Sequence, residues 1–318
     1  MIRYIFKRIL LMIPVIIGVI TLVFTILYFS DGDVVDTLAS EITTETEKEQ
    51  MRRDLGLDRP YIVQLADYIW NLFTKFDLGN TIVNKSNIAK DLSSRYPNSI
   101  RIALGGMIFS VVIGIPLGVF AALHQGKIGD TLATCVSLLG VSTPGFWAAL
   151  MLVIIFSYKF PVLPALGTGT WQHWVLPIAA TSLHGVGKLT RQARSSVLEV
   201  IRSDYVMMAK SKGLSSQTVI WKHVIPNALM PLVTTAGMTF GTQLGGGLVI
   251  ERVFSIPGVG GYLTDMVNQR DTRGVLGGVV MTAIAFCTVM LLCDLLMAFI
   301  DPRIKARYAS KKRRKKNA

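Results

Sequence analysis

Long apolar stretches alternate with short polar segments along almost the whole chain. A helix of about 20 apolar residues is long enough to cross the roughly 30 Å hydrocarbon core of a bilayer. The pattern therefore predicts an all-α, polytopic membrane protein with six transmembrane helices. These helices are expected at residues 9–29, 100–123, 131–158, 174–189, 227–250 and 274–300.

The first apolar stretch follows three basic residues, Arg3, Lys7 and Arg8. A cleaved signal peptide is the alternative interpretation. The apolar run is longer than a usual signal-peptide core, however, and no small-residue cleavage site follows it closely. The pattern favours an uncleaved first span with the N-terminus inside the cell.

A polar, initially acidic segment separates the first two spans and divides the chain into four parts. These are a cytoplasmic N-terminus with the first helix (1–29), an extracellular insert (30–97), a core of five helices (98–301) and a basic cytoplasmic tail (302–318). Within the insert, apolar residues recur at helical spacing, so an amphipathic helix is expected on the outer membrane face or on another subunit. Its apolar residues are Tyr61, Ile62, Leu65, Ile69, Leu72 and Phe73.

Composition agrees with a membrane protein. Of 318 residues, 51% are hydrophobic, and the mean hydropathy is +0.48, which is too apolar for one soluble domain. The net charge of +13 raises nucleic acid as a partner, but the basic residues concentrate in segments placed inside the cell, as the positive-inside rule requires. We expect no nucleic acid partner, and a tail that contacts anionic lipid. Cys135, Cys287 and Cys293 lack metal-binding spacing, so neither a disulfide nor a metal site is expected.

The segment between the fourth and fifth spans is the most organised polar part of the chain. We call residues 197–226 the hairpin. Val197, Leu198, Ile201, Tyr205 and Met208 share one helical face. Gly213 interrupts the pattern, since glycine adopts the positive φ that ends a helix. Ser215 and Ser216 can cap a second short helix, expected at 218–225, and Pro226 suits the first turn of the next helix.

Two interpretations of the hairpin follow from its shape alone. A basic, partly apolar surface of two short helices suits docking into a groove on a partner protein. A positively charged membrane-surface loop, common in multi-span proteins, is the interpretation that shape alone favours.

A resemblance separates these interpretations. Ala209, Gly213, Ile225 and Pro226 match the loop typical of ABC-transporter permeases: Glu-Ala-Ala, three residues, Gly, nine residues, Ile, any residue, Leu-Pro. The string DYVMMAKSKGLSSQTVIWKHVIPNALMPLVT resembles the binding-protein-dependent peptide and nickel permeases. Met207 and Met208 replace the Glu and first Ala, and His223 replaces the first Ile. The strings DLGLDRP (54–60), FDLGN (76–80), ERVFSIPGVGGYL (251–263, with Val259 for Leu) and DPRIKAR (301–307) are also similar to this family.

The resemblance implies a type I ABC-importer permease fold and a role as one permease subunit in the cell membrane, with both termini in the cytoplasm. It implies a second permease subunit, two ABC ATPase subunits that bind ATP and Mg²⁺, and an extracellular solute-binding protein. The hairpin would be the coupling segment that contacts the ATPase. The coupling residues expected on this basis are Asp204, Tyr205, Ala209, Lys210, Gly213, Leu214, Ser215, His223 and Pro226.

The fifth predicted span is rich in glycine and in hydroxyl and amide side chains. Glycines four residues apart allow helices to approach closely, and polar residues in a span face other helices or a water-filled path. Both a pathway-lining helix and a tightly packed glycine helix fit this pattern. The candidate pathway residues are Thr239, Thr242, Gln243, Gly245 and Gly246.

The chain lacks the G-x-x-x-x-G-K-[ST] phosphate-binding loop and any evident catalytic set, so it is expected to be no enzyme and to hold no cofactor. Short peptides are the expected substrates, and nickel or a metal chelate is the alternative within the family. An ion-coupled secondary transporter is the alternative from another class. It would carry paired acids or an inverted repeat at mid-membrane, and neither is evident. Asp294 and His184, both intramembrane, fit packing or hydrogen-bonding roles as well as functional ones.

Overall fold

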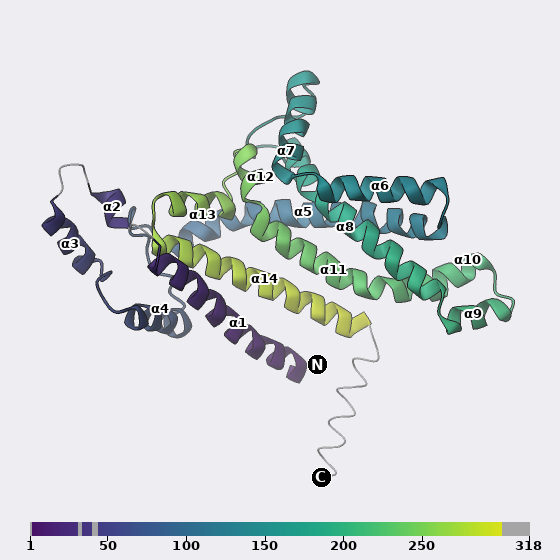
Figure 1. Cartoon of the computed structure of the whole chain (residues 1–318), viewed down its shortest axis with the longest axis horizontal. Coiled ribbons are helices and arrows are strands. Elements are labelled where there is room, and N and C mark those ends of the chain that lie inside the picture. The colour runs from purple at the N-terminus through teal and green to yellow at the C-terminus, as the bar shows by residue number, and fades with distance from the viewer. Residues whose placement is uncertain (1, 31–33, 40–43, 301–318) are drawn as a thin grey trace, which may run out of the picture. The chain divides into compact units, whose positions relative to one another are not determined.

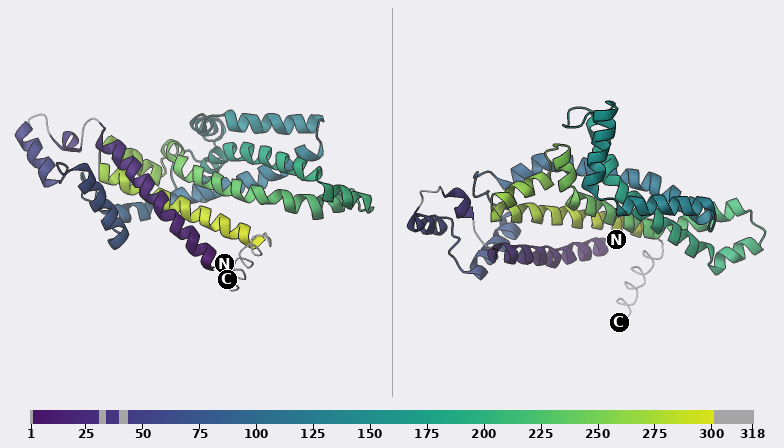
Figure 2. Two further views of the ribbon diagram at one scale, coloured as in Figure 1. Left: turned by 60° about the horizontal axis from the view of Figure 1, so that its bottom comes forward. Right: turned by 45° about the horizontal axis from the view of Figure 1, so that its top comes forward.

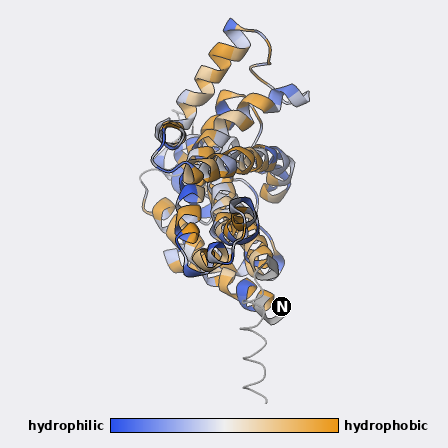
Figure 3. Ribbon diagram, turned by 90° about the vertical axis from the view of Figure 1, so that its right-hand side faces the viewer, coloured by the Kyte–Doolittle hydropathy of each residue, from blue (hydrophilic) through white to orange (hydrophobic). Residues whose placement is uncertain are grey.

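The computed structural model describes residues 2–30, 34–39 and 44–300, and every regular element within these ranges is helical (Figure 1). The all-α prediction is confirmed. Hydrophobic residues predominate along the helices (Figure 3). The predicted basic tail and the DPRIKAR motif lie outside the described residues.

The helices follow one another in this order: α1 (Ile2–Tyr28), α2 (Val34–Leu38), α3 (Glu45–Asp54), α4 (Tyr61–Lys75), α5 (Ile88–Leu123), α6 (Ile128–Ser142), α7 (Gly145–Val153), α8 (Val175–Ile201), α9 (Asp204–Ser211), α10 (Ser216–Val219), α11 (Ile225–Gly246), α12 (Leu248–Val253), α13 (Val259–Asn268) and α14 (Thr272–Ile300). Three single turns join them: a π-turn η1 (Ile154–Lys159), a 3₁₀ turn η2 (Trp171–Trp174) and a π-turn η3 (Ile220–Val224).

The chain forms two compact units. Among the described residues, the N-terminal unit contains residues 2–99 and 257–288, and the hairpin unit contains residues 100–256 and 289–300. Of the three boundaries between the units, one falls within α5 and another falls within α14. The four-part organisation inferred from the sequence stays a prediction.

Three described helices are long and apolar enough to cross a membrane: Ile5–Tyr28, Ile88–Leu123 and Thr272–Met297. The pair of helices at Ile128–Ser142 and Gly145–Lys159 becomes a fourth if it is counted as one broken span. Helices α8 and α11 occupy the places of the fourth and fifth predicted spans, but their composition is more polar. The count of six spans therefore stays a prediction.

The third predicted span is not one continuous helix. Its two halves are bent by 99° at a short break, where Thr143 has an extended backbone (φ −75°, ψ 121°). The ring of Pro144 disfavours the α conformation at the preceding residue. The Thr143 hydroxyl donates to the Leu139 carbonyl at 2.6 Å. The proline therefore ends α6 and starts α7 within the predicted span.

The second predicted span begins earlier than expected, because α5 starts at Ile88 and continues through Pro97. Ile88, Leu92 and Tyr96 recur every four residues and are buried. This apolar face continues the helix into the polar insert. The sequence predicts that the insert ends at Pro97, but the buried apolar face extends α5 through this proline.

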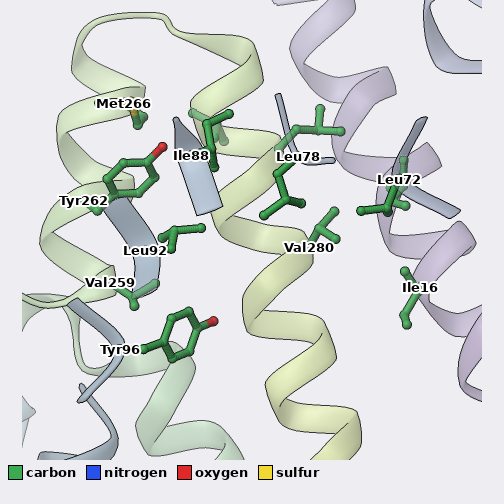
Figure 4. Close-up of a cluster of buried hydrophobic side chains, with 13 residues drawn as sticks. Ile16, Leu72, Leu78, Ile88, Leu92, Tyr96, Val259, Tyr262, Met266 and Val280 are labelled. Atoms are coloured by element: carbon green, nitrogen blue, oxygen red, sulfur yellow. The ribbon is translucent and has the colours of Figure 1, made fainter. Parts of the chain in front are cut away.

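The core of the N-terminal unit is made by α1, α4, α5, α13 and α14. Figure 4 shows side chains from these helices pointing toward one another, including Ile16, Leu72, Leu92 and Tyr262. Helix α4 confirms the expected amphipathic helix, although Ile62 lies on its exposed side.

Asp271 joins the loop at Ile82 and Val83 to the start of α14. Its carboxylate is fully buried. One oxygen accepts from the backbone N–H groups of Ile82 and Val83, and the other accepts from Gly274 N–H at 2.9 Å. A carboxylate that caps a helix N-terminus in this way also interacts favourably with the helix dipole.

In the hairpin unit, α8 is packed against α5 at backbone contact distance. A Cβ atom at Gly114 would lie 2.9 Å from the Val186 carbonyl oxygen, and one at Gly118 would overlap the Thr190 carbonyl oxygen. These two glycines have the G-x-x-x-G spacing that permits such an approach.

Helix α6 approaches α8 in the same manner from another side. A Cβ at Gly140 would lie 2.7 Å from the Leu183 carbonyl oxygen, and one at Gly187 would overlap the Ser137 carbonyl oxygen. The start of α6 is also held by a two-pronged ion pair, in which Arg194 of α8 donates to both oxygens of Asp130 at 2.6 and 2.7 Å. Helix α8 is therefore the centre of the unit.

The close contact of α5 and α8 generates a prediction. Gly118→Ala should lower the free energy of unfolding by about 1–3 kcal/mol, because its Cβ meets backbone that cannot move aside cheaply. Thermal unfolding of the purified protein in detergent measures this change.

Gly245→Ala is the matched control. Gly245 is helical and has nothing within 4 Å of the added Cβ, so alanine there should be neutral or stabilising by up to about 1 kcal/mol. Equal effects of the two substitutions would contradict the packing described for Gly118.

Candidate functional site

The hairpin contains the end of α8, then α9, α10 and η3. Helices α9 and α10 lie next to each other beyond the ends of α8 and α11 (Figures 1 and 2). The predicted pair of short helices at this position is present.

The first arm of the hairpin is not one helix, contrary to the single apolar face expected from 197 onward. Ser203 has an extended backbone (φ −74°, ψ 148°) and separates α8 from α9. The helical phase is therefore reset at this residue. Val206 and Ala209 are buried after the break, whereas Tyr205 and Met208 are exposed.

The turn between the two arms has the predicted geometry. Gly213 has φ +80°, and a Cβ built there would meet nothing within 4 Å. Glycine is thus required at this position by the backbone conformation and not by steric crowding. Ser215 caps α10, because its hydroxyl oxygen accepts from the Thr218 N–H at 3.3 Å.

The second arm differs from the expected short, separate helix. Helix α10 begins at Ser216 and passes through η3 into α11 without a break. The wide π-turn ends directly before α11, and Pro226 stands in the first turn of α11, as predicted. Proline has no N–H to donate and its ring crowds the preceding turn, so a π-turn there keeps the helix continuous. Residues 216–246 therefore form one helical rod.

A small apolar core holds the hairpin rigidly to the rest of its unit. Val206 and Ala209 of the first arm and Val219 and Val224 of the second arm are buried. They pack in one cluster with Ala122 of α5, Val197 of α8 and Ala228 of α11. Each arm is thus anchored by buried side chains to the ends of three long helices.

The opposite surface of the hairpin exposes large apolar side chains beside polar and basic ones. Trp221 is 69% exposed, Met208 60%, Met207 56%, Tyr205 45% and Leu214 41%. Asp204, Lys210 and Lys222 are also exposed. Exposed large apolar side chains on a helical support are typical of a protein-binding surface, and Trp and Met are suited to it. We call these five apolar residues the hairpin surface.

The sequence missed part of this surface. Met207, Met208 and Trp221 are not among the predicted coupling residues, although a tryptophan in a polar segment between spans is a recognisable signal. Ala209, by contrast, is buried, and His223 is half-buried. The backbone carbonyl of His223 accepts from the Asn227 side chain at 2.7 Å. These two residues belong to the support of the hairpin, not to its exposed surface.

The five candidate pathway residues divide into two groups. Thr242, Gly245 and Gly246 are exposed on α11. Thr239 is buried, and the Gln243 amide donates to the Thr181 carbonyl of α8 at 3.2 Å. A pathway role for all five stays a prediction.

Other candidate sites are few. Within residues 2–30, 34–39 and 44–300, no group of three or more His, Cys, Asp or Glu side chains is arranged to hold a metal ion. His184 is exposed on α8, and Asp294 is half-buried in α14.

Two family patterns match the chain. The one described as "Binding-protein-dependent transport system inner membrane component" matches residues 114–306, and its N-terminal companion matches residues 1–103. The hairpin and all the candidate pathway residues lie within the first match.

Among curated proteins, the chain is 34% identical to the dipeptide transport system permease protein DppB of Alkalihalophilus pseudofirmus, over 96% of this chain and 100% of that protein. It is 32% identical to the glutathione transport system permease protein GsiC of Escherichia coli (strain K12), over 96% and 99% of the two chains. Similarity therefore extends over essentially the full length of these relatives.

Among solved structures, an inward-facing form of the MetNI methionine ABC transporter is similar, with a TM-score of 0.54 and 16% identity. The match covers 66% of this chain and 96% of that chain. A second similar chain, from an amino acid ABC transporter with histidines, has a TM-score of 0.50 and 13% identity, with 68% and 94% covered. These matches support the fold.

The left-handed turn generates a prediction. Gly213→Val should lower the free energy of unfolding by about 1–2 kcal/mol, because a side chain at positive φ is strained. Gly213→Asn is the control, since asparagine tolerates this conformation, and its thermal unfolding should stay close to wild type. If both variants unfold alike, the elbow does not depend on the φ of this residue.

Proposed function

We propose how force and substrate pass through this chain, which belongs to the family of binding-protein-dependent transport system inner membrane components. The chain is a multi-pass membrane permease subunit of an ABC importer. It is not itself an enzyme, because ATP hydrolysis in this family belongs to a separate subunit. The proposal concerns its partners, its orientation and its substrate.

The hairpin surface is the proposed contact with the ATPase subunit, which places the hairpin and both termini in the cytoplasm. The support is the combination of large exposed apolar side chains and a buried core beneath them. A surface that transmits force must not yield, and buried contacts to α5, α8 and α11 give this rigidity.

The continuous helix from 216 to 246 supplies the mechanism. When ATP closes the ATPase pair, each hairpin is displaced with it. Because no flexible loop separates α10 from α11, the displacement is passed directly to α11 and, through Val197 and Val206, to α8. Two permease subunits would rock between inward-open and outward-open states around a shared path, as rigid-body alternating access requires.

Short peptides are the proposed substrates, delivered by an extracellular solute-binding protein. The support is full-length similarity to relatives named for dipeptide and glutathione transport. A second permease subunit and two ATPase subunits, which bind ATP and Mg²⁺, complete the proposed assembly.

One prediction tests the hairpin surface. Trp221→Ala should weaken binding of the ATPase subunit about 30-fold, since a central tryptophan in an interface often contributes about 2 kcal/mol. Surface plasmon resonance on the detergent-solubilised permease measures this affinity. Met51→Ala removes an exposed methionine in the N-terminal unit and should leave the affinity unchanged. Unchanged binding in Trp221→Ala would place the ATPase contact elsewhere.

A second prediction tests the transport activity. Proteoliposomes that contain the two permeases and the ATPases, supplied with the binding protein and internal ATP, should accumulate labelled dipeptide. Removing ATP should abolish accumulation, and an ionophore that collapses ion gradients should not. Accumulation of nickel without peptide would favour the metal alternative, and loss of uptake with the ionophore alone would favour a secondary transporter.

A further inference from the structure

Helix α8 has a stripe of polar residues on one face, and most of its other residues are buried or half-buried. It has 27 residues, long enough to cross a membrane, yet its composition keeps it out of the apolar spans. At 100° per residue its polar, outward-facing residues fall within an arc of about 80°. We call them the α8 stripe: His184, Lys188, Arg191, Ser195 and Glu199.

Other helices of the unit cover most of the remaining circumference of α8, although Leu183 is 39% exposed. Gly114 and Gly118 bring α5 to backbone contact, and Gly140 does the same for α6. Helix α11 contacts α8 through Gly185, where a Cβ would lie 3.0 Å from the Thr239 side chain. The stripe is thus the face of α8 that its own unit leaves open.

Three members of the stripe lack an internal partner. Within the part of the chain that the structure describes, His184, Lys188 and Arg191 make no side-chain hydrogen bond or ion pair. Arg194, only three residues from Arg191, differs because it is paired with Asp130. Arg194 therefore has a structural role in this unit, whereas Lys188 and Arg191 can bind a ligand.

Such a stripe does not suit contact with hydrocarbon. His184 lies within the predicted fourth span (174–189), whereas Lys188 lies in its last turn and Arg191 just beyond its end, where long cationic side chains can reach water. Helix α6 of the same unit shows what a lipid-facing surface looks like, with Leu132, Val136 and Leu139 exposed. The α8 stripe is suited instead to a water-filled path, where intramembrane ionisable groups are usually found.

We infer that Lys188 and Arg191, with His184 one turn away, bind the carboxylate of the peptide during its passage. This inference rests on the proposed function, because a peptide always brings a terminal carboxylate. Side chains three or four residues apart on a helix are about 5–6 Å apart at Cβ. An ammonium and a guanidinium at this spacing can share one carboxylate through charge-assisted hydrogen bonds.

The charges along the stripe also differ between its two halves. Glu199 stands eight residues beyond Arg191, about 12 Å further along the helix. A carboxylate does not bind an anion, so the part of the stripe that can bind one is the half that contains His184, Lys188 and Arg191.

The first arm of the test asks whether the stripe faces water. Single variants His184→Cys and Arg191→Cys in the assembled complex are treated with a membrane-impermeant, negatively charged thiol reagent, and the wild-type complex is the blank for the native cysteines. We expect labelling of both above the blank. Val136→Cys, on the apolar face of α6, is the control and should stay at the level of the blank. Absence of labelling at both stripe positions overturns the inference.

The second arm asks whether the stripe recognises negative charge. Uptake of Ala-Glu and Ala-Lys is measured in proteoliposomes with wild-type permease and with the double variant Lys188→Glu/Arg191→Glu. The ratio of Ala-Glu to Ala-Lys uptake should fall at least tenfold in the variant. The same binding protein serves both complexes, so its own preference cancels in the comparison. Lys127→Glu, an exposed cation outside the stripe, should change the ratio less than twofold.

The outcomes separate this inference from the proposed function. An unchanged ratio, with ATP hydrolysis intact, overturns the inference and leaves the permease function standing. Uptake of neither peptide by the wild-type complex overturns the proposed function, and the carboxylate site fails with it. If the double variant does not copurify with the ATPase, Arg191→Gln replaces it, with an expected fall of at least threefold in the same ratio.

Discussion

Backbone contact between helices is the constraint on which the hairpin unit depends. Helix α8 approaches α5 and α6 so closely that a single methyl group at Gly118 or Gly187 would overlap a neighbouring carbonyl oxygen. Lipid offers no hydrophobic driving force for helix association, so close packing is a principal source of stability. Helices α5 and α6 cover two faces of α8 in this way, and α11 covers a third through side-chain contact at Gly185.

The same packing joins the hairpin to the long helices of its unit. A displaced hairpin moves α8 and α11 together, because its buried core includes residues of both helices and no loop intervenes before α11. The pair of Arg194 and Asp130 adds the start of α6 to the same rigid group. The hairpin end of α8 is thereby part of the same packed unit as the face of α8 that bears Lys188 and Arg191.

Much of the hairpin could be predicted from the sequence because its signals are local. A positive φ at Gly213, a cap at Ser215 and a proline in the first helical turn each depend on one residue and its immediate neighbours. The break at Ser203 and the continuous helix through Pro226 were missed. Serine fits both a helix and a break, and proline fits the first turn of a new helix as well as a continuous helix with a π-turn before it. Burial of Val206 and Val224 accompanies the conformations that the structure adopts.

The sequence by itself determined the class of the protein, its apolar segments and the place of its elbow, because hydrophobic periodicity and turn chemistry are properties of short stretches. The tertiary structure alone decided which glycines are close contacts, which cations are paired and which face of each helix is open. Those properties depend on groups far apart in the chain. Arg191 and Arg194 have the same charge and lie three residues apart, but among the residues that the structure describes only Arg194 meets a carboxylate, 64 residues away. Composition carries no information about this ion pair, because the pair depends on how α6 and α8 pack.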